Sequence, residues 1–424
     1  MIALPRSLLR PADAAAPGSR STERRSAAIV LALAAALSVG VGDAGAGQVK
    51  RFQLDTPQAL ADARSRGVAV FPDGSLAPMP PLVKVAEFDE PLGLALAVTD
   101  DGVAFVGTGH PARVWRVHDG GKSLLAELDA DQVTSLLVDP EGTLWATTAV
   151  PATLLKFSSS GKPVVASALP EGNLWDLAWF RGALVAAAGN PGRLLRLGAH
   201  GLELAATVPD RHARCLAVSG AELLVGTSGL GLVLRWSGAG GVGVLYDSPF
   251  TEIAALSVDR DGTAWAVGVT GDPTLGKPAK ESSEASVTAT TEEAPQLGDT
   301  GGATSEILRI LPSGAVITAH RFPKQIAGSI DVSATGLVVG TTADGELWQL
   351  VEGVAAQLDT VEAAQVSRVA RGGAWVLSQG PVALFNRRGT PTGDFTSPPL
   401  DAGQPAEWGE IRVVRNGGAA RACT

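Results

Sequence analysis

A repeat with a period near 40 residues is the feature that most limits how this chain can fold. The copies share an apolar run, a turn that reads D-x-x-G in the clearest copies, a second apolar run, and a third run that contains a basic residue in five of them. The position near the end of the second run recurs at intervals of 40, 40, 39, 41, 73 and 37 residues, at Gly107, Thr147, Ala187, Gly226, Val267, Gly340 and Leu377. Runs this short, bounded by glycine and rich in β-branched residues, indicate strands and exclude a helical repeat.

Seven copies of short strands at this period predict an all-β protein, a seven-bladed β-propeller of four-stranded antiparallel blades. The last copy lacks an obvious fourth strand, whereas residues 82–88 read as a strand that precedes the first copy. We expect this N-terminal strand to close the ring by pairing with the last blade, because closure removes free strand edges. The alternative is that residues 392–398 supply the missing strand from the C-terminal side.

The repeat divides the chain into parts. Residues 47–81 form an N-terminal extension, with a short helix expected over residues 56–67 and a hairpin-like stretch over residues 68–78. The propeller spans residues 82–394. Residues 271–305 interrupt it between two strands of the fifth blade, and their Ser, Thr, Glu, Pro and Gly content without aromatics predicts disorder on the loop face. Residues 395–424 fit no blade and are interpreted as the truncated start of a further β domain.

The first 46 residues have the features of a signal peptide. Arg24 and Arg25 precede an apolar run at residues 27–42, and Ala44-Gly45-Ala46 follows as a cleavage site. The run is shorter than the roughly 20 residues of a membrane span. We therefore expect cleavage before Gly47 and an exported protein, periplasmic or extracellular, without a membrane span. The general and twin-arginine export routes both remain open.

Net charge and cysteine content limit the classes of partner that the chain can bind. The net charge is −9, and no cluster of Lys and Arg follows Arg25, which argues against nucleic acid and anionic membrane surfaces. The two cysteines, Cys215 and Cys423, form no disulfide framework. We expect a monomer that binds an unknown protein or small-molecule ligand.

Several residues that resemble chemical motifs have structural interpretations. Asp139, Asp259 and Asp261 occur at D-x-x-G turns, where Asp and Gly are favoured for backbone reasons. The recurring tryptophans and basic residues of the second and third strands indicate packing between blades. The histidines have no zinc-ligand spacing. The sequence therefore predicts no catalytic constellation, no metal and no cofactor.

Residues that break the repeat are the candidates for binding. Two adjacent columns of the first strands align, and Asp176, Arg214 and Arg368 depart from their small or apolar pattern. His212 and Glu252 occur in loops that lead into first strands. In a propeller the first strand of each blade lines a central tunnel. These five residues could bind a ligand at the mouth of that tunnel, or they could pair with one another inside a water-filled tunnel. The sequence leaves both interpretations open.

Three segments carry a family resemblance. RGVAVFPDGSLAP, the repeats of type LxVDxDGTLWxGT, and SPPLDAGQPAEWG resemble large exported bacterial proteins of the acidobacterial type, described as WD40-like or two-component-regulator-like propellers. The resemblance covers residues 60–412. It implies the propeller and, after the closing segment, a C-terminal β-sandwich that is missing here. It implies no activity.

Two functions follow as hypotheses. The first is a binding or scaffolding module that recognises its ligand on the loop face bearing the insertion, because a rigid ring with variable loops suits recognition. The alternative is a propeller enzyme, a lactonase, lyase or hydrolase, with a site near Asp176, His212, Arg214 and Glu252. Stoichiometric calcium or zinc in the purified protein would favour the enzyme.

Overall fold

A computed structural model describes residues 50–61, 63–118, 121–158, 161–270, 304–323, 325–401 and 403. The predicted signal peptide at residues 1–46, the predicted mature start at Gly47, nearly all of the 271–305 insertion and residues 404–424 lie outside the described residues. The chain divides into two compact units, Met1–Arg51 and Phe52–Thr424. All elements described below belong to the second unit.

The described elements are strands, apart from the short helix α2 (Pro57–Leu60). The strands of the N-terminal part are β1 (Arg64–Arg66), β2 (Val68–Val70), β3 (Leu76–Pro78), β4 (Leu82–Phe88), β5 (Leu92–Val98), β6 (Ala104–Gly109), β7 (Arg113–His118), β8 (Gly121–Glu127), β9 (Gln132–Val138), β10 (Leu144–Ala149), β11 (Thr153–Phe157) and β12 (Pro163–Ala168). Those that follow are β13 (Asn173–Phe180), β14 (Ala183–Gly189), β15 (Arg193–Gly198), β16 (Gly201–Thr207), β17 (His212–Ser219), β18 (Glu222–Ser228), β19 (Leu232–Trp236), β20 (Gly243–Asp247), β21 (Glu252–Val258) and β22 (Ala264–Thr270). The remaining strands are β23 (Thr304–Ile310), β24 (Val316–Phe322), β25 (Ala327–Ser333), β26 (Gly336–Thr341), β27 (Glu346–Val351), β28 (Val354–Thr360), β29 (Gln365–Ala370), β30 (Trp375–Gln379), β31 (Val382–Arg387) and β32 (Asp394–Thr396).

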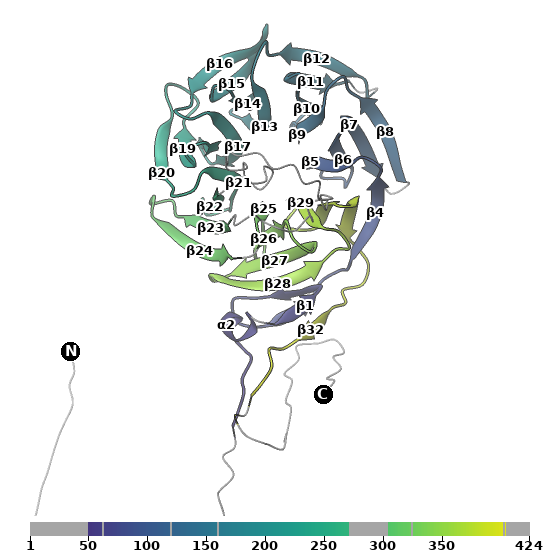
Figure 1. Cartoon of the computed structure of the whole chain (residues 1–424), viewed down its shortest axis with the longest axis vertical. Coiled ribbons are helices and arrows are strands. Elements are labelled where there is room, and N and C mark those ends of the chain that lie inside the picture. Colours follow the sequence, from purple (N-terminus) through teal and green to yellow (C-terminus); the bar gives the residue numbers. More distant parts are fainter. Residues whose placement is uncertain are drawn as a thin grey trace, which may run out of the picture. The chain divides into compact units, whose positions relative to one another are not determined.

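From β5 onward the strands form groups, and within a group each strand pairs antiparallel with the next one along the chain, as β5 does with β6, β6 with β7 and β7 with β8. The strands that begin the groups are β5, β9, β13, β17, β21, β25 and β29, and each contacts the next one along the chain. The circuit closes, because β29 also contacts β5. Figure 1 shows these inner strands around a common centre, with the later strands of each group further out. The all-β prediction is therefore confirmed, and the strands form a closed circular array.

The N-terminal strand β4 completes the last group, as the sequence predicted. Residues of β4 pair antiparallel with β31, with Phe88 opposite Val382 and Leu82 opposite Arg387. The alternative from the C-terminal side is wrong, because β32 pairs with β1 instead, with Phe395 opposite Ser65. Segments from the two ends of the array are thus held together at two places (Figure 1).

The N-terminal extension packs on the outer strand β28. Its helix ends at Leu60, sooner than the sequence suggested, and Arg64–Arg66 form a strand instead. The extension gains hydrogen bonds from Gly67 N to Leu358 O, at 3.0 Å, and from Val70 N to Gln349 Oε1, also at 3.0 Å. These tertiary contacts override the local helical tendency. The expected hairpin is present as β2 and β3.

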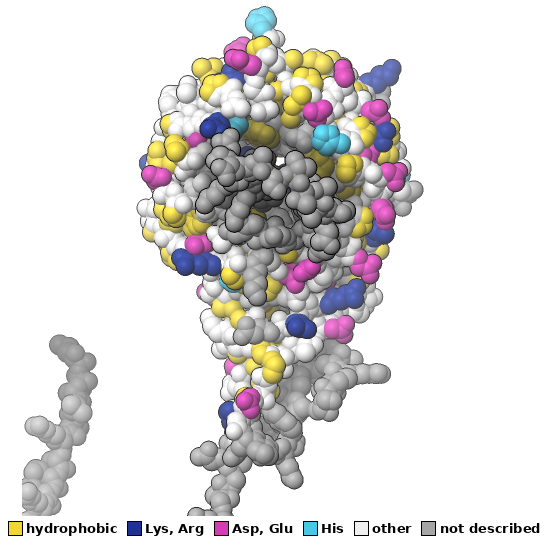
Figure 2. Space-filling model, in the orientation of Figure 1, with side chains coloured by type: hydrophobic (Ala, Val, Ile, Leu, Met, Phe, Trp, Pro, Cys, Tyr) yellow, Lys and Arg dark blue, Asp and Glu magenta, His cyan; other side chains and the backbone are white. Residues whose placement is uncertain are grey.

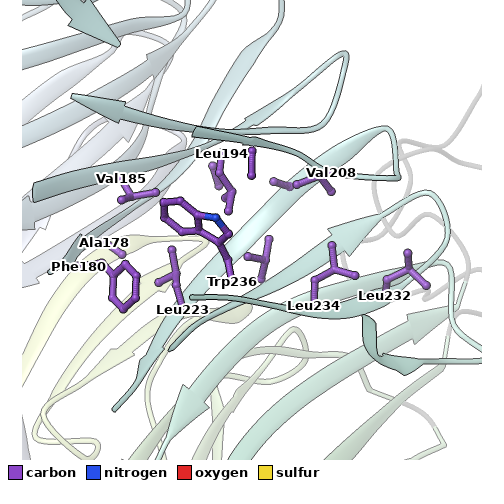
Figure 3. Packing of buried hydrophobic residues seen from close by; sticks show 13 residues of the cluster. Ala178, Phe180, Val185, Leu194, Val208, Leu223, Leu232, Leu234 and Trp236 are labelled. Carbon is purple, nitrogen blue, oxygen red and sulfur yellow. The ribbon is translucent and has the colours of Figure 1, made fainter. Parts of the chain in front are cut away.

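The apolar core lies between neighbouring sheets. One cluster packs the group β13 to β16 against the group β17 to β20, and in it the rings of Phe180 and Trp236 have centroids 5.9 Å apart (Figure 3). Trp236 is 2% exposed. An equivalent cluster joins the last sheet to the first, with Phe88 and Leu384 beside Val106. This packing at each junction fixes the inner strands, which then position the side chains near the centre.

The aspartates of the D-x-x-G turns are structural, as the sequence predicted. Asp139 accepts hydrogen bonds from Thr143 N, at 2.7 Å, and from Trp145 Nε1, at 2.8 Å. Lys156 of the next strand lies 5.3 Å from the centroid of a Trp145 ring. The corresponding residues of another turn are Asp259, Thr263, Trp265 and Arg309. The carboxylate therefore caps its turn and fixes a tryptophan that packs under a basic side chain.

Candidate functional site

A β-bulge recurs at the same place in each of the described inner strands. The extra residues, which have no partner on the second strand, are Leu94, Thr134, Trp175, Arg214, Ala254, Gly328 and Ser367. The residues that follow them pair with the repeating positions of the second strand, for example Asp176 with Ala187. The two columns aligned from the sequence are therefore the bulge column and the column after it. Because a bulge redirects a side chain, it explains how two consecutive residues can both serve the site.

Asp176 bridges three inner strands. It accepts hydrogen bonds from Ser135 Oγ on β9 and from Leu216 N on β17, each at 2.9 Å. Ser329 makes a similar link, because its Oγ accepts from Val369 N at 3.0 Å. Burial raises the pKa of the Asp176 carboxyl, and the donor Leu216 N opposes that rise. Asp176 thus satisfies a backbone N–H between sheets, which is a structural task.

Arg214 and Glu252 form a partly accessible ion pair. Arg214 Nε donates to Glu252 Oε1 at 3.0 Å, and the two side chains are 33% and 28% exposed. Glu252 Oε2 accepts from Ser228 Oγ at 3.2 Å. The guanidinium also lies 4.9 Å from the centroid of a Trp175 ring, within the range of a cation–π contact. Trp175, Arg214 and Glu252 therefore join the inner strands of three successive groups, β13, β17 and β21.

His212 completes this group through Trp175. The indole Nε1 donates to His212 Nδ1 at 3.2 Å, and the two rings meet edge to face at 79°. Burial lowers the pKa of His212, and the positive charge of Arg211 lowers it further. The imidazole is therefore neutral near pH 7, and its proton resides on Nε2 because Nδ1 accepts from Trp175. We call Trp175, His212, Arg214, Ser228 and Glu252 the central cluster.

Gly189 provides the space in which Trp175 and His212 meet. A Cβ at Gly189 would lie 2.0 Å from His212 Nδ1 and 2.6 Å from Trp175 Nε1. Gly189 is also the strand partner of His212. Only a residue without a side chain therefore permits this hydrogen bond next to the backbone of β14.

Gly189→Ala is expected to destabilise the protein by about 1–3 kcal/mol, because the added methyl overpacks the contact between Trp175 and His212. Urea unfolding gives the free-energy difference. The matched control is Gly241→Ala, since a Cβ at Gly241 meets nothing within 4 Å. Equal stability of the two variants would contradict the tight contact.

Arg368 remains apart from the central cluster. Its Nη1 donates to Ser367 O at 2.8 Å. Burial lowers the pKa of Arg368 to about 10, the positive charge of Arg214 adds to this, and Asp176 opposes it. The structure thus brings His212, Arg214 and Glu252 together, whereas Asp176 and Arg368 are their electrostatic neighbours.

Three members of the site were missed in the sequence. Trp175 stood in the aligned bulge column, and its aromatic character was the available signal. Ser228 and Gly189 end second strands and become neighbours of Glu252 and His212 through pairing between adjacent sheets. Glu252 and His212 themselves are the first residues of strands, not loop residues.

The central cluster lies at the sheet edge from which the inserted segment leaves. Glu252 pairs with Val269, and the next residue, Thr270, pairs with Thr304. Thr270 and Thr304 flank residues 271–303.

On the face drawn in Figure 2, basic and acidic side chains are interspersed over the described surface. Within the described residues, no group of three or more His, Cys, Asp or Glu side chains is placed to hold a metal ion. The described part of the chain likewise contains no helix with the length and apolarity that a membrane crossing requires.

Comparisons with known proteins identify the fold. No protein-family model matches this chain, and no curated protein matches it in sequence. A catalytically inactive variant of virginiamycin B lyase from Staphylococcus aureus, solved with quinupristin, is similar at a TM-score of 0.56 and 13% identity over 72% of this chain and 98% of that chain. YCF48 bound to D1 peptide is similar at a TM-score of 0.53 and 13% identity over 74% of this chain and 100% of that chain.

A third similar structure is the extracellular domain of a putative hybrid two-component system from B. thetaiotaomicron. Its TM-score is 0.51 at 10% identity, over 74% of this chain and 40% of that chain. At such low identities these likenesses support the β-propeller fold and leave activity open. The propeller part of the resemblance inferred from the sequence is thereby confirmed, while its assignment to the acidobacterial type finds no sequence-family support.

Proposed function

We propose that the chain is an exported, seven-bladed β-propeller of four-stranded blades that binds a polypeptide segment at the central cluster. The observation that carries the proposal is the convergence of an aromatic ring, an imidazole and a partly exposed ion pair from β13, β17 and β21. Tryptophan and arginine are the residues that most often dominate binding energy at protein interfaces. The rigid inner strands hold these groups in place before a ligand arrives.

The state of the polar groups favours binding over catalysis. Both carboxylate oxygens of Glu252 already accept hydrogen bonds from Arg214 and Ser228. His212 Nδ1 accepts from Trp175, which leaves a protonated Nε2 near neutral pH, a donor and not a base. A general base needs a lone pair directed at its substrate, and the only ring lone pair of neutral His212, on Nδ1, already accepts from Trp175. The cluster is therefore suited to hold a shape and to donate hydrogen bonds.

Export and domain layout belong to the same proposal. The basic residues, the apolar run and Ala44-Gly45-Ala46 support a signal peptide at residues 1–46 and a periplasmic or extracellular location. The proposed domains are an extension at residues 47–81 and a propeller at residues 82–394, and the insertion at 271–305 borders the binding face. A monomer is the proposed state.

A lyase is the second candidate. It is favoured by the fold likeness to virginiamycin B lyase and by the presence of His212 in the central cluster. The two candidates differ in what they do to a substrate. Turnover of quinupristin by the purified chain would support the lyase, whereas binding without turnover would support recognition.

The test uses chain 50–424 and a phage library of random peptides about ten residues long, followed by titration of the selected peptides. Glu252→Gln and Arg214→Met are expected to weaken the selected peptides at least about tenfold, equivalent to ~1.4 kcal/mol. The matched control is Glu87→Gln, which alters an exposed ion pair on β4. No enrichment of peptides, or equal binding by all three variants, would refute the proposal.

A further inference from the structure

A cavity lies on the outer side of the array, separate from the central cluster. It has a volume of about 780 Å³ and lies between the N-terminal extension and strands β24, β27 and β28. Figure 1 shows α2 and β1 beside β28, where the extension forms one wall. Cavities of roughly 300–1,000 Å³ are the size that binds small molecules. None of the residues of the central cluster lines this cavity.

Three aromatic rings stand in sequence along the propeller side of the cavity. Phe322 meets His320 edge to face at a centroid distance of 4.6 Å, and it meets Trp348 in the same manner at 6.0 Å. Phe322 is buried, while His320 and Trp348 are partly exposed. Burial lowers the pKa of His320, so its imidazole is neutral near pH 7. The partly exposed rings of His320 and Trp348 therefore present uncharged ring surfaces, with the buried ring of Phe322 between them.

A fixed carboxylate stands next to these rings. Glu346 Oε2 accepts from Gln325 Nε2 at 2.6 Å and from Trp348 Nε1 at 3.1 Å, and Gln357 Nε2 lies 3.4 Å from Oε1. Three neutral donors therefore hold Glu346 in one orientation. Such a carboxylate is prepared to accept further hydrogen bonds at its remaining lone pairs.

Gln325 supplies an acceptor without a donor. Its Oε1 is buried and, among the described residues, has no hydrogen-bond partner. A buried acceptor left unpaired is unfavourable, so a ligand hydroxyl that reaches Oε1 and donates a hydrogen bond would relieve that cost. The amide nitrogen of the same side chain is engaged with Glu346. The acceptor is thus fixed in place as well.

Charge at the cavity favours a neutral ligand. Arg321 is committed to Glu306, with Nε and Oε1 2.8 Å apart. Among the described lining residues, Arg64 of the extension and Glu346 of the propeller remain as opposite charges. Glu346 would repel an anion and Arg64 would repel a cation, whereas a neutral group is repelled by neither.

We propose that this cavity binds a neutral saccharide unit. The hydroxyls of a pyranose donate and accept hydrogen bonds around its rim, which suits Glu346, Gln325 and Gln357. Its C–H face is apolar and packs against aromatic rings such as Trp348. The N-terminal extension forms the opposite wall, so the site exists only where the extension is docked on β28.

The experiment applies chain 50–424 to a printed array of neutral plant and bacterial oligosaccharides, and then titrates the best-bound member by calorimetry. Glu346→Gln and Gln325→Leu are each expected to weaken binding at least about tenfold. Gln58→Trp is expected to abolish binding, because Gln58 is an exposed lining residue of α2 and the larger side chain would fill the cavity from outside the propeller.

Gln53→Trp is the matched control, since Gln53 is exposed on the same extension and does not line the cavity. It is expected to bind as the parent chain does. The melting temperature of each variant shows whether the fold persists. Absence of any bound array member overturns the proposal. So does binding that Gln58→Trp and Gln53→Trp leave equally strong, or binding confined to charged glycans.

Discussion

A chain that begins at Asp89 is expected to aggregate and to lose cooperative unfolding, whereas one that begins at Pro80 remains a folded monomer. The difference between the two is β4. Without it, β31 becomes an open edge that exposes Val382 and Leu384, and such edges invite intermolecular pairing. Size-exclusion chromatography and urea unfolding report the two outcomes. A soluble, cooperative monomer that lacks β4 would refute the closure.

A chain that ends at residue 391 provides the matched control for this truncation. It loses β32, whose three residues pair only with β1 in the described array. Its expected cost is small compared with the loss of β4. A point variant refines the result, because Phe88→Ala removes a side chain that is 4% exposed and should cost about 3–5 kcal/mol. Val83→Ala on the same strand is 37% exposed and should cost less than about 1 kcal/mol.

The repeat could be recognised in the amino-acid sequence because the features that define it are local. Strand length, turn residues and spacing aligned Ala187 and Gly226 in one column and Asp176 and Cys215 in another, and in the structure Ala187 pairs with Asp176 and Gly226 with Cys215. Closure by β4 was also readable, since a repeat that lacks one strand implies another source for it. The pairing of β1 with β32 was not readable. Each of these strands has three residues, and more than 300 residues separate them, so neither pattern nor proximity indicates the contact.

The central cluster was only half predictable. Alignment of the repeats identified Arg214 and Asp176 as departures from a column, because an unusual residue in a regular array is visible in sequence. The partner of each residue depends on how adjacent sheets pack. The hydrogen bond from Trp175 to His212 exists because Gly189 lets two sheets approach closely, and sequence spacing carries no measure of that distance.

The other large effect is expected from a buried ion pair that joins the last two groups of strands. Arg387 Nη1 on β31 lies 2.9 Å from Asp359 Oδ2 on β28, and the two side chains are 4% and 5% exposed. The same guanidinium donates to Pro80 O at 3.0 Å and to Gly373 O at 3.2 Å. One side chain therefore connects the segment before β4 to two neighbouring sheets. Burial lowers the pKa of Arg387, and Asp359 opposes that change.

Asp359→Ala is expected to destabilise the protein by about 3–5 kcal/mol, because it leaves the guanidinium buried without its counter-charge. Arg387→Met should also be destabilising, because it leaves the buried Asp359 carboxylate without its counter-charge. The carboxylate then keeps the hydrogen bond from Thr360 N. The double variant should lose less than the sum of the two, because neither charge is left unpaired. Urea unfolding of the four chains gives the coupling free energy.

The exposed pair Lys84–Glu87, 53% and 52% exposed, is the control cycle, with an expected coupling below about 1 kcal/mol. Equal coupling in the two cycles would show that burial adds nothing to the Arg387–Asp359 pair, and that closure depends on the strand pairing of β4 and its apolar side chains alone.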